Sequence, residues 1–169
     1  LINAYRNRLI FSTMEANTAF QTGGAQYQSG AGLGFATLDT AINTITDATD
    51  AKVIVGRRSA LMKLGRQTNF SEISKREFEL TGYVGSYAGI PMAKVNSFTD
   101  PTYGSVYPMC NNDLWIFSEM PVGKFVVATD VSGSSENIMQ TGVMHIYLRW
   151  EDGFGLLHTN RAARVALVA

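Results

Sequence analysis

The sequence TGYVGSYAGIPMAKVNSF, residues 81–98, is the stretch that decides the fold. Glycines at positions 82, 85 and 89 and a proline at 91 are separated by aromatic and β-branched residues. Because glycine permits positive φ and proline fixes φ, the pattern predicts short strands at Val84–Tyr87 and Met92–Val95 with a turn at Ala88 and Gly89. Apart from glutamates just upstream, no acid, base or nucleophile is paired with it. A corner of a structural domain is therefore favoured over a catalytic loop.

Helices and one strand are predicted before this stretch. Apolar residues at three- and four-residue spacings indicate a helix over residues 1–21, and five glycines within residues 22–35 indicate a loop or hinge. Thr37 is the expected cap of a second helix. The apolar run AKVIVG, residues 51–56, predicts a buried strand, and residues 59–65 predict a short helix.

Strands are predicted for most of the remaining chain. The runs at 114–117 and 122–130 are apolar or rich in β-branched residues, and residues 143–150 alternate strictly between an apolar and a mixed face. An Asp-Gly pair then gives a turn signal, and residues 161–169 read as a returning strand. The sequence therefore predicts that 143–150 and 161–169 form a long two-stranded hairpin.

Composition excludes several classes of protein. Fourteen basic residues balance fourteen acidic ones, whereas a nucleic-acid binder usually has a basic excess. A single cysteine excludes internal disulfides and four-cysteine zinc sites. No apolar run approaches the roughly 20 residues of a membrane helix. Charged residues are only 17% of the 169, which suits a surface covered by partners.

Candidate catalytic and ligand sites have plainer interpretations. GAGLGF, residues 30–35, lacks the strand and the spacing of a dinucleotide fingerprint. His145 and His158 would lie too far apart on the predicted hairpin to share a metal. Glu77 and Glu79 share a strand face at a distance suited to an inverting glycosidase, but Lys and Arg precede them, which favours a solvated loop. Cys110 has no histidine near it in the sequence. We therefore expect no catalytic, cofactor or metal site.

One local charge bias remains. Arg57, Arg58, Lys63 and Arg66 form a basic cluster, which is either a solvated helix face or a contact with another subunit or with nucleic acid. We treat these four residues as a candidate assembly interface.

The order of these predicted helices, strands and motifs resembles that of a known protein family. GSYAGIP, Gly85–Pro91, follows the small helices, and a charged strand, an aromatic turn and a return strand close the chain. The residues concerned in this closing part are Glu151, Asp152, Phe154, Arg161, Ala163 and Val165. In this order the pieces resemble the major capsid proteins of tailed bacteriophages, which have the Hong Kong 97-type fold.

The resemblance implies an α+β fold with a spine helix, a mixed axial domain and a long C-terminal β-hairpin. Residues 1–34 would be the end of the spine helix and a hinge of the peripheral domain, 35–140 the axial domain, and 141–169 the closing hairpin. The family's N-terminal arm and extended loop are not visible, so the chain resembles the C-terminal two-thirds of a family member.

The implied function is structural. Copies would form pentamers and hexamers of an icosahedral phage head, assembled in the bacterial host cytoplasm, which encloses DNA without sequence-specific binding. Scaffolding, portal and decoration proteins are further candidate partners. No contact with a membrane is expected. Two alternatives stay open: a nanocompartment shell of the same fold, and a small hydrolase that uses Cys110 or the Glu77 and Glu79 pair.

Overall fold

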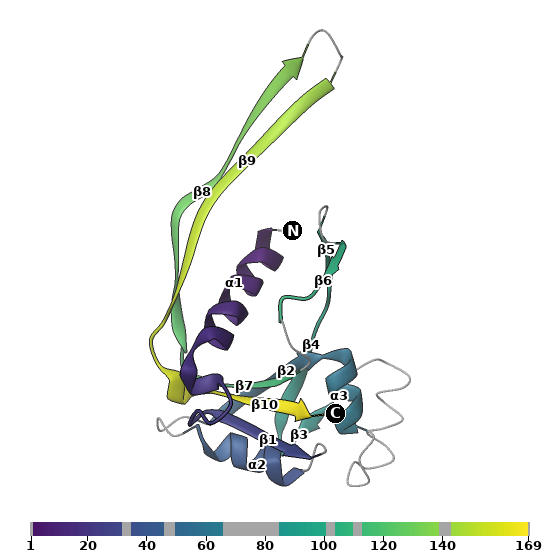
Figure 1. Cartoon of the computed structure of the whole chain (residues 1–169), viewed down its shortest axis with the longest axis vertical. Coiled ribbons are helices and arrows are strands. Elements are labelled where there is room, and N and C mark those ends of the chain that lie inside the picture. Colours follow the sequence, from purple (N-terminus) through teal and green to yellow (C-terminus); the bar gives the residue numbers. More distant parts are fainter. Residues whose placement is uncertain are drawn as a thin grey trace.

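A computed structural model describes residues 2–31, 35–45, 50–65, 85–100, 104–109, 113–138 and 143–168. Its helices are α1 (Ile2–Ala16), α2 (Phe35–Asn43) and α3 (Arg58–Gly65), with 3-10 turns η1 (Thr18–Phe20) and η2 (Thr159–Arg161). Its strands are β1 (Tyr27–Ala31), β2 (Ala51–Arg57), β3 (Ser86–Tyr87), β4 (Ile90–Val95), β5 (Phe98–Asp100), β6 (Gly104–Val106), β7 (Leu114–Ser118), β8 (Gly123–Ile138), β9 (Val143–Leu156) and β10 (Ala162–Val168). The fold is α+β, as predicted (Figure 1).

A mixed sheet organises the body of the molecule. Among the described residues its strand order is β1-β10-β7-β2-β4-β3. β1 is parallel to β10 and β2 is parallel to β4, whereas β7 runs antiparallel to both β10 and β2. The sheet thus combines strands from all three predicted segments of the chain, and the domain boundaries at 34 and 140 stay predictions.

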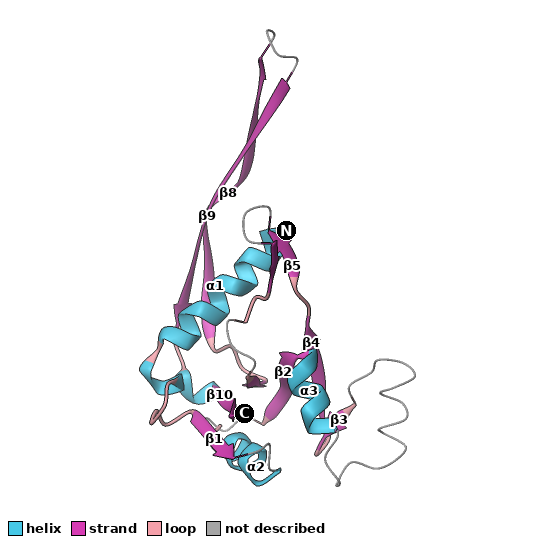
Figure 2. Cartoon of the chain, turned by 45° about the vertical axis from the view of Figure 1, so that its right-hand side comes forward, coloured by secondary structure: helices cyan, strands magenta, loops and turns pink. Residues whose placement is uncertain are grey.

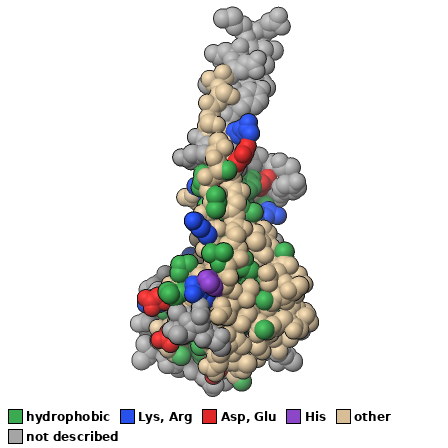
Figure 3. Space-filling model, turned by 90° about the vertical axis from the view of Figure 1, so that its left-hand side faces the viewer, with side chains coloured by type: hydrophobic (Ala, Val, Ile, Leu, Met, Phe, Trp, Pro, Cys, Tyr) green, Lys and Arg blue, Asp and Glu red, His purple; other side chains and the backbone are tan. Residues whose placement is uncertain are grey.

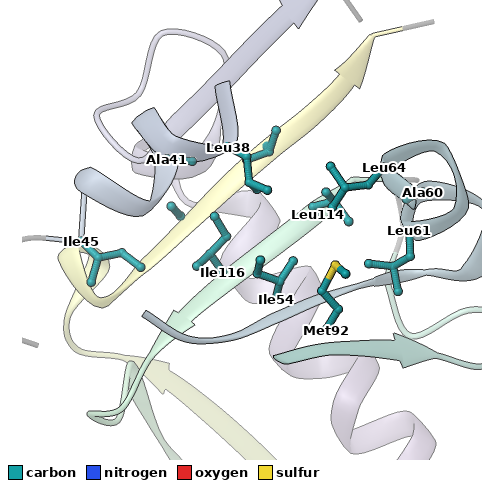
Figure 4. Packing of buried hydrophobic residues seen from close by; sticks show 12 residues of the cluster. Leu38, Ala41, Ile45, Ile54, Ala60, Leu61, Leu64, Met92, Leu114 and Ile116 are labelled. Carbon is teal, nitrogen blue, oxygen red and sulfur yellow. The ribbon is translucent and has the colours of Figure 1, made fainter. Parts of the chain in front are cut away.

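Alternating side chains of the sheet pack against two layers. Ile54, Leu114 and Ile116 face α2 and α3, and the next residues along β7, Trp115 and Phe117, belong to the layer that contains α1. The α2 and α3 layer is shown in Figure 4, where Leu38, Ala41, Ile45, Ala60, Leu61, Leu64 and Met92 complete the labelled cluster. Period-two alternation therefore gives this sheet a hydrophobic core on each face.

A two-stranded arm leaves this body. β8 and β9 pair antiparallel along almost their whole length, from Gly123 opposite Leu156 to Ile138 opposite Val143. Figure 1 shows the arm extending well beyond the sheet, and Figure 2 shows α1 lying along its lower half. We call residues 123–127 and 152–156 the base of the arm, and residues 132–138 and 143–149 its outer half.

The predicted pairing of 143–150 with 161–169 is wrong. β9 pairs with β8, and β10 instead enters the sheet between β1 and β7. The Asp152 and Gly153 pair, taken as a turn signal, lies inside β9 opposite Val127 and Val126. Alternation along 143–150 identified a strand, but it carries no information about the partner strand, which nonlocal packing decides.

The opening stretch forms the predicted corner. β3 and β4 pair at Tyr87 and Ile90, leaving a two-residue turn at Ala88 and Gly89. Both turn residues have positive φ, 48° and 82°, which is the requirement of a type I′ turn. The turn prediction is confirmed, although the strands are Ser86–Tyr87 and Ile90–Val95.

Replacing Ala88 with asparagine should stabilise the protein. Alanine is strained at φ 48°, whereas asparagine tolerates this region and Asn-Gly is the preferred type I′ pair. We expect the free energy of unfolding to rise by about 0.5–1 kcal/mol in chemical denaturation. Gly89→Ala is the opposing variant and should destabilise, because φ 82° disfavours any side chain. A loss of stability in Ala88→Asn would contradict the assigned turn.

Candidate assembly surface

The predicted basic cluster divides between two environments. Arg57 ends β2 and is half-buried, whereas Arg58 begins α3 and Lys63 lies in its last turn, both exposed. Arg66 lies outside the described residues. The structure therefore places Arg58 and Lys63 on one short helix with Arg57 directly before it.

Arg57 makes contacts within its own chain. Its guanidinium lies 4.3 Å from the ring centroid of Tyr107 and donates a hydrogen bond to the carbonyl oxygen of Met109. These contacts connect the end of β2 to the segment that follows β6. The exposed charge of the cluster is thus carried by Arg58 and Lys63, and its role in assembly stays a prediction.

The arm is the other prominent surface. Ser132, Gly133, Ser134 and Ser135 on β8 are exposed, as is the side chain of Arg149 on β9. At the base, Val126 retains 52% of its accessible surface. An isolated two-stranded hairpin is marginally stable in water, because it has no second layer to bury its side chains against. The outer half of the arm is therefore poorly supported by its own chain.

The base of the arm is fastened to α1. The Arg6 guanidinium donates from Nε to Asp152 Oδ2 at 2.7 Å and from Nη2 to Oδ1 at 3.2 Å, a two-bond fork. The Asp152 side chain is only 5% exposed, and the Arg6 guanidinium also lies 5.6 Å from the Phe125 ring. The first turns of α1 thereby fix the direction in which the arm leaves the body.

The same end of α1 contacts the β5–β6 hairpin. The Tyr5 hydroxyl donates a hydrogen bond to Asp100 Oδ2, and its ring packs edge-on against Phe98 with centroids 5.1 Å apart. Arg6 and Tyr5 therefore connect α1 to two separate hairpins through neighbouring residues. Sequence reasoning missed these contacts, because the Arg6 and Asp152 partners stand 146 residues apart and no local spacing pairs them.

Asp39 and Tyr87 connect α2 to the corner at β3. The Tyr87 hydroxyl donates to Asp39 Oδ1 at 2.7 Å. Burial, and then the hydrogen bond and negative charge of Asp39, raise the pKa of Tyr87 from 10.0 to about 12. The neutral phenol is thus favoured in the folded state.

This pKa gives a stability change at high pH. Because the unfolded state loses the Tyr87 proton near pH 10 and the folded state keeps it until about 12, the stabilisation is present below pH 10 and is lost between pH 10 and 12. Tyr87→Phe should therefore show a shallower fall of unfolding free energy over that window than the native chain. Denaturation at several pH values measures it, and identical slopes would contradict the contact. Tyr107→Phe is the matched control, because Tyr107 makes no contact with Asp39 in the described structure.

The described structure has open cavities on its surface. One of about 400 Å³ is lined by Tyr5, Arg6, Leu9, Glu151 and Asp152, and Arg6 and Asp152 are engaged with each other there. Another of about 330 Å³ is lined by Gln21, Thr22, Tyr27 and Arg164. Within the described ranges no three His, Cys, Asp or Glu residues gather as metal ligands. No described helix is long and apolar enough to span a membrane.

The residues of the hydrolase alternative, Cys110, Glu77 and Glu79, lie outside the described residues. The two histidines are not neighbours on a hairpin. Position 145 pairs with position 136 in the arm, and His158 precedes η2.

Comparison with known proteins gives a similarity to a solved structure. No protein family and no curated protein sequence matches the chain. The crystal structure of a phage-related protein from Bordetella bronchiseptica RB50 superposes with a TM-score of 0.55 at 11% sequence identity. The match covers 94% of this chain and 60% of that one, so the chain spans about three-fifths of its neighbour's length. At this identity, the similarity establishes a shared fold.

Proposed function

We propose that the chain is the structural subunit of a phage head, a major capsid protein whose copies assemble into an icosahedral shell around DNA. The observation that carries the proposal is the fold shared with a phage-related protein over 94% of the chain. The resemblance of the sequence to phage capsid proteins also supports the proposal. A shell protein acts through its surfaces, and closed assemblies require complementary patches repeated on every copy.

The described surface suits such a role. The arm extends away from the sheet and carries exposed small polar residues along β8. Small polar side chains cost little conformational entropy when a neighbour covers them. A neighbouring copy would provide the second layer that the outer half of the arm lacks. The equal numbers of acidic and basic residues also favour a wall that neither binds DNA strongly nor repels it.

Electron microscopy of the purified chain at increasing concentration tests the proposal. We expect shells, capsomers or tubes built from many copies, and a species that stays monomeric at millimolar concentration would contradict it. The contents of shells purified from cells discriminate the phage head from the nanocompartment, because one protects DNA from nuclease and the other holds an enzyme. Rapid labelling of Cys110 by a thiol-reactive probe would instead favour the hydrolase.

Reversing the exposed part of the basic cluster should weaken assembly. We expect Arg58→Glu with Lys63→Glu to raise the concentration needed for assembly by about tenfold, because acidic side chains at these positions would repel the carboxylates of a neighbouring copy that the basic ones would attract. Light scattering gives that concentration, and circular dichroism checks that the fold is retained. Lys52→Glu makes the charge change of each single reversal at an exposed site elsewhere and serves as the control. An equal effect per reversed charge in Lys52→Glu would mean that net charge, not this helix, controls assembly.

A further inference from the structure

One edge of β9 is open. In the part of the chain that the structure describes, β9 pairs with β8 alone, so its other edge has no partner strand. Such an edge presents a row of backbone N–H and C=O groups to any strand that can align with it. α1 packs against β9, but a helix uses its backbone N–H and C=O groups internally and so supplies no strand hydrogen bonds to that edge. The Arg6 side chain of α1 pairs with Asp152 of β9 and lies over the Phe125 ring of β8. Both contacts are on the face of the arm that is turned toward the body.

Bulges, which protect a strand edge from further pairing, lie on β8 and not on β9. Between the pairs Val127–Asp152 and Thr129–Glu151, and again between Thr129–Glu151 and Ser132–Arg149, β8 has more residues than β9. Extra residues bend the strand that contains them and interrupt its pairing. β8 is bent in this way (Figure 1), whereas β9 runs without an inserted residue from Val143 to Leu156. β9 therefore offers the straighter edge of the arm.

The sequence of β9 is complementary to itself when reversed about position 150. Antiparallel pairing centred there sets Arg149 opposite Glu151 of a second copy, and Glu151 opposite the second Arg149. It also sets Tyr147 opposite Gly153 and His145 opposite Gly155. The Cβ position of Gly153 has no atom within 4 Å, so that site has room for a large side chain from outside. Charge and size thus match at successive positions of one face.

We propose that two copies of this chain pair antiparallel through their β9 edges, about a two-fold axis at residue 150. Opposite charges directly opposite each other stabilise antiparallel pairs, and an aromatic side chain can cover a glycine at a strand edge. The contact is isologous, since each copy contributes the same surface. The inference deepens the proposed function, and rests on it, by naming one contact between subunits.

The side chains that this pairing needs are accessible. Arg149 and Glu151 are 77% and 49% exposed, and in the single chain they contact each other along the same face. Figure 3 shows a basic and an acidic side chain next to each other on the surface of the arm. The pairing replaces two exposed contacts within strands, one in each copy, by two contacts between strands. It also places the outer half of each arm beside the base of the other.

Charge reversal in separate chains tests the proposal. Arg149→Glu gives one copy two acidic positions and Glu151→Arg gives another copy two basic positions, so each variant repels itself at the axis. We expect each variant alone to show a dimer dissociation constant at least about tenfold above the native value by analytical ultracentrifugation. An equimolar mixture should return to within about threefold of the native value, because every opposed pair is complementary again.

The matched control uses an exposed ion pair of the body. Lys52 and Glu119 lie 3.8 Å apart with side chains 66% and 69% exposed. Lys52→Glu and Glu119→Lys produce the same net charges as the β9 variants, and their mixture should gain no affinity over the separate proteins. Equal recovery in both mixtures, or no recovery in the β9 mixture, would overturn the proposal.

A cross-link separates this contact from assembly in general. In a Cys110→Ser background, Arg149→Cys mixed with Glu151→Cys should give an intermolecular disulfide in most copies, because directly opposed strand residues lie within disulfide range. Lys52→Cys mixed with Glu119→Cys should give little. Shells that form without the β9 cross-link would overturn the pairing and leave the proposed function standing. A chain that never associates would overturn both.

Discussion

Replacing Arg164 with alanine should lower the free energy of unfolding by about 3–5 kcal/mol, because it leaves a buried carboxylate without its cation. The Arg164 guanidinium lies 2.7 Å from Asp113 Oδ2 through Nη2 and donates to the Phe20 carbonyl oxygen at 3.0 Å. Both members of the ion pair have side chains only 10% exposed. The guanidinium also stands between the rings of Tyr27 and Trp115, on the two neighbouring strands.

Two further variants show whether the unpaired charge causes that loss. Arg164→Met with Asp113→Asn should cost clearly less than Arg164→Ala, since no charge is left buried alone. Lys52→Ala, which breaks an exposed pair, should change stability by no more than about 1 kcal/mol. Urea denaturation measures all three, and a loss below about 1 kcal/mol in Arg164→Ala would contradict the buried pair.

Trp115→Ala should cost a similar amount, about 3–5 kcal/mol, through the cavity that it leaves. Trp115 is fully buried at the centre of the α1 layer. Its ring contacts those of Phe11, Phe20 and Phe117, with centroids 6.0, 5.2 and 6.3 Å away. Removing it separates α1 and η1 from the sheet.

The phenylalanine variant isolates the polar part of this side chain. Trp115 Nε1 is buried without a hydrogen-bond partner among the described residues. Trp115→Phe removes that N–H together with some volume, so the relief of an unsatisfied donor offsets part of the cavity. We expect a net change within about 1 kcal/mol of the native stability, measured by the same denaturation. A loss equal to that of Trp115→Ala would mean that the indole N–H has a partner.

Elements that local rules specify were predictable from sequence. The strand at 114–117 is observed as Leu114–Ser118, and the strand at 51–56 as Ala51–Arg57. Both are apolar runs bounded by polar residues, and both lie in the middle of the sheet, where burial on two faces demands such runs. The turn at Ala88 and Gly89 was also predictable, because it depends on positions where φ must be positive.

Elements that depend on a distant partner were not predictable. The end of β8, residues 132–137, is SGSSEN, a sequence with low strand propensity that extends only because β9 pairs with it. β1 lies in the glycine-rich stretch that predicted a loop, and its pairing with β10 makes it a strand. α2 begins at Phe35 rather than after a cap at Thr37, and the helix predicted over 1–21 ends at Ala16.

The candidate surface shows the same division. Clustering in the sequence identified Arg58 and Lys63, which are exposed on α3. It could not separate them from Arg57, whose contacts with Tyr107 and Met109 cross about 50 residues of chain. The ion pairs that fix the arm and the sheet, Arg6 with Asp152 and Arg164 with Asp113, exist only once distant strands have met.

The position of β10 sets the order of events during synthesis. β10 lies between β1 and β7, and the Arg164 amide donates to the Gln26 carbonyl oxygen at 2.8 Å. Until residues 162–168 have left the ribosome, β1 has no strand beside it and one edge of β7 is bare. Pairings across such sequence separations form slowly. A nascent chain therefore cannot complete its sheet while these residues remain in the exit tunnel.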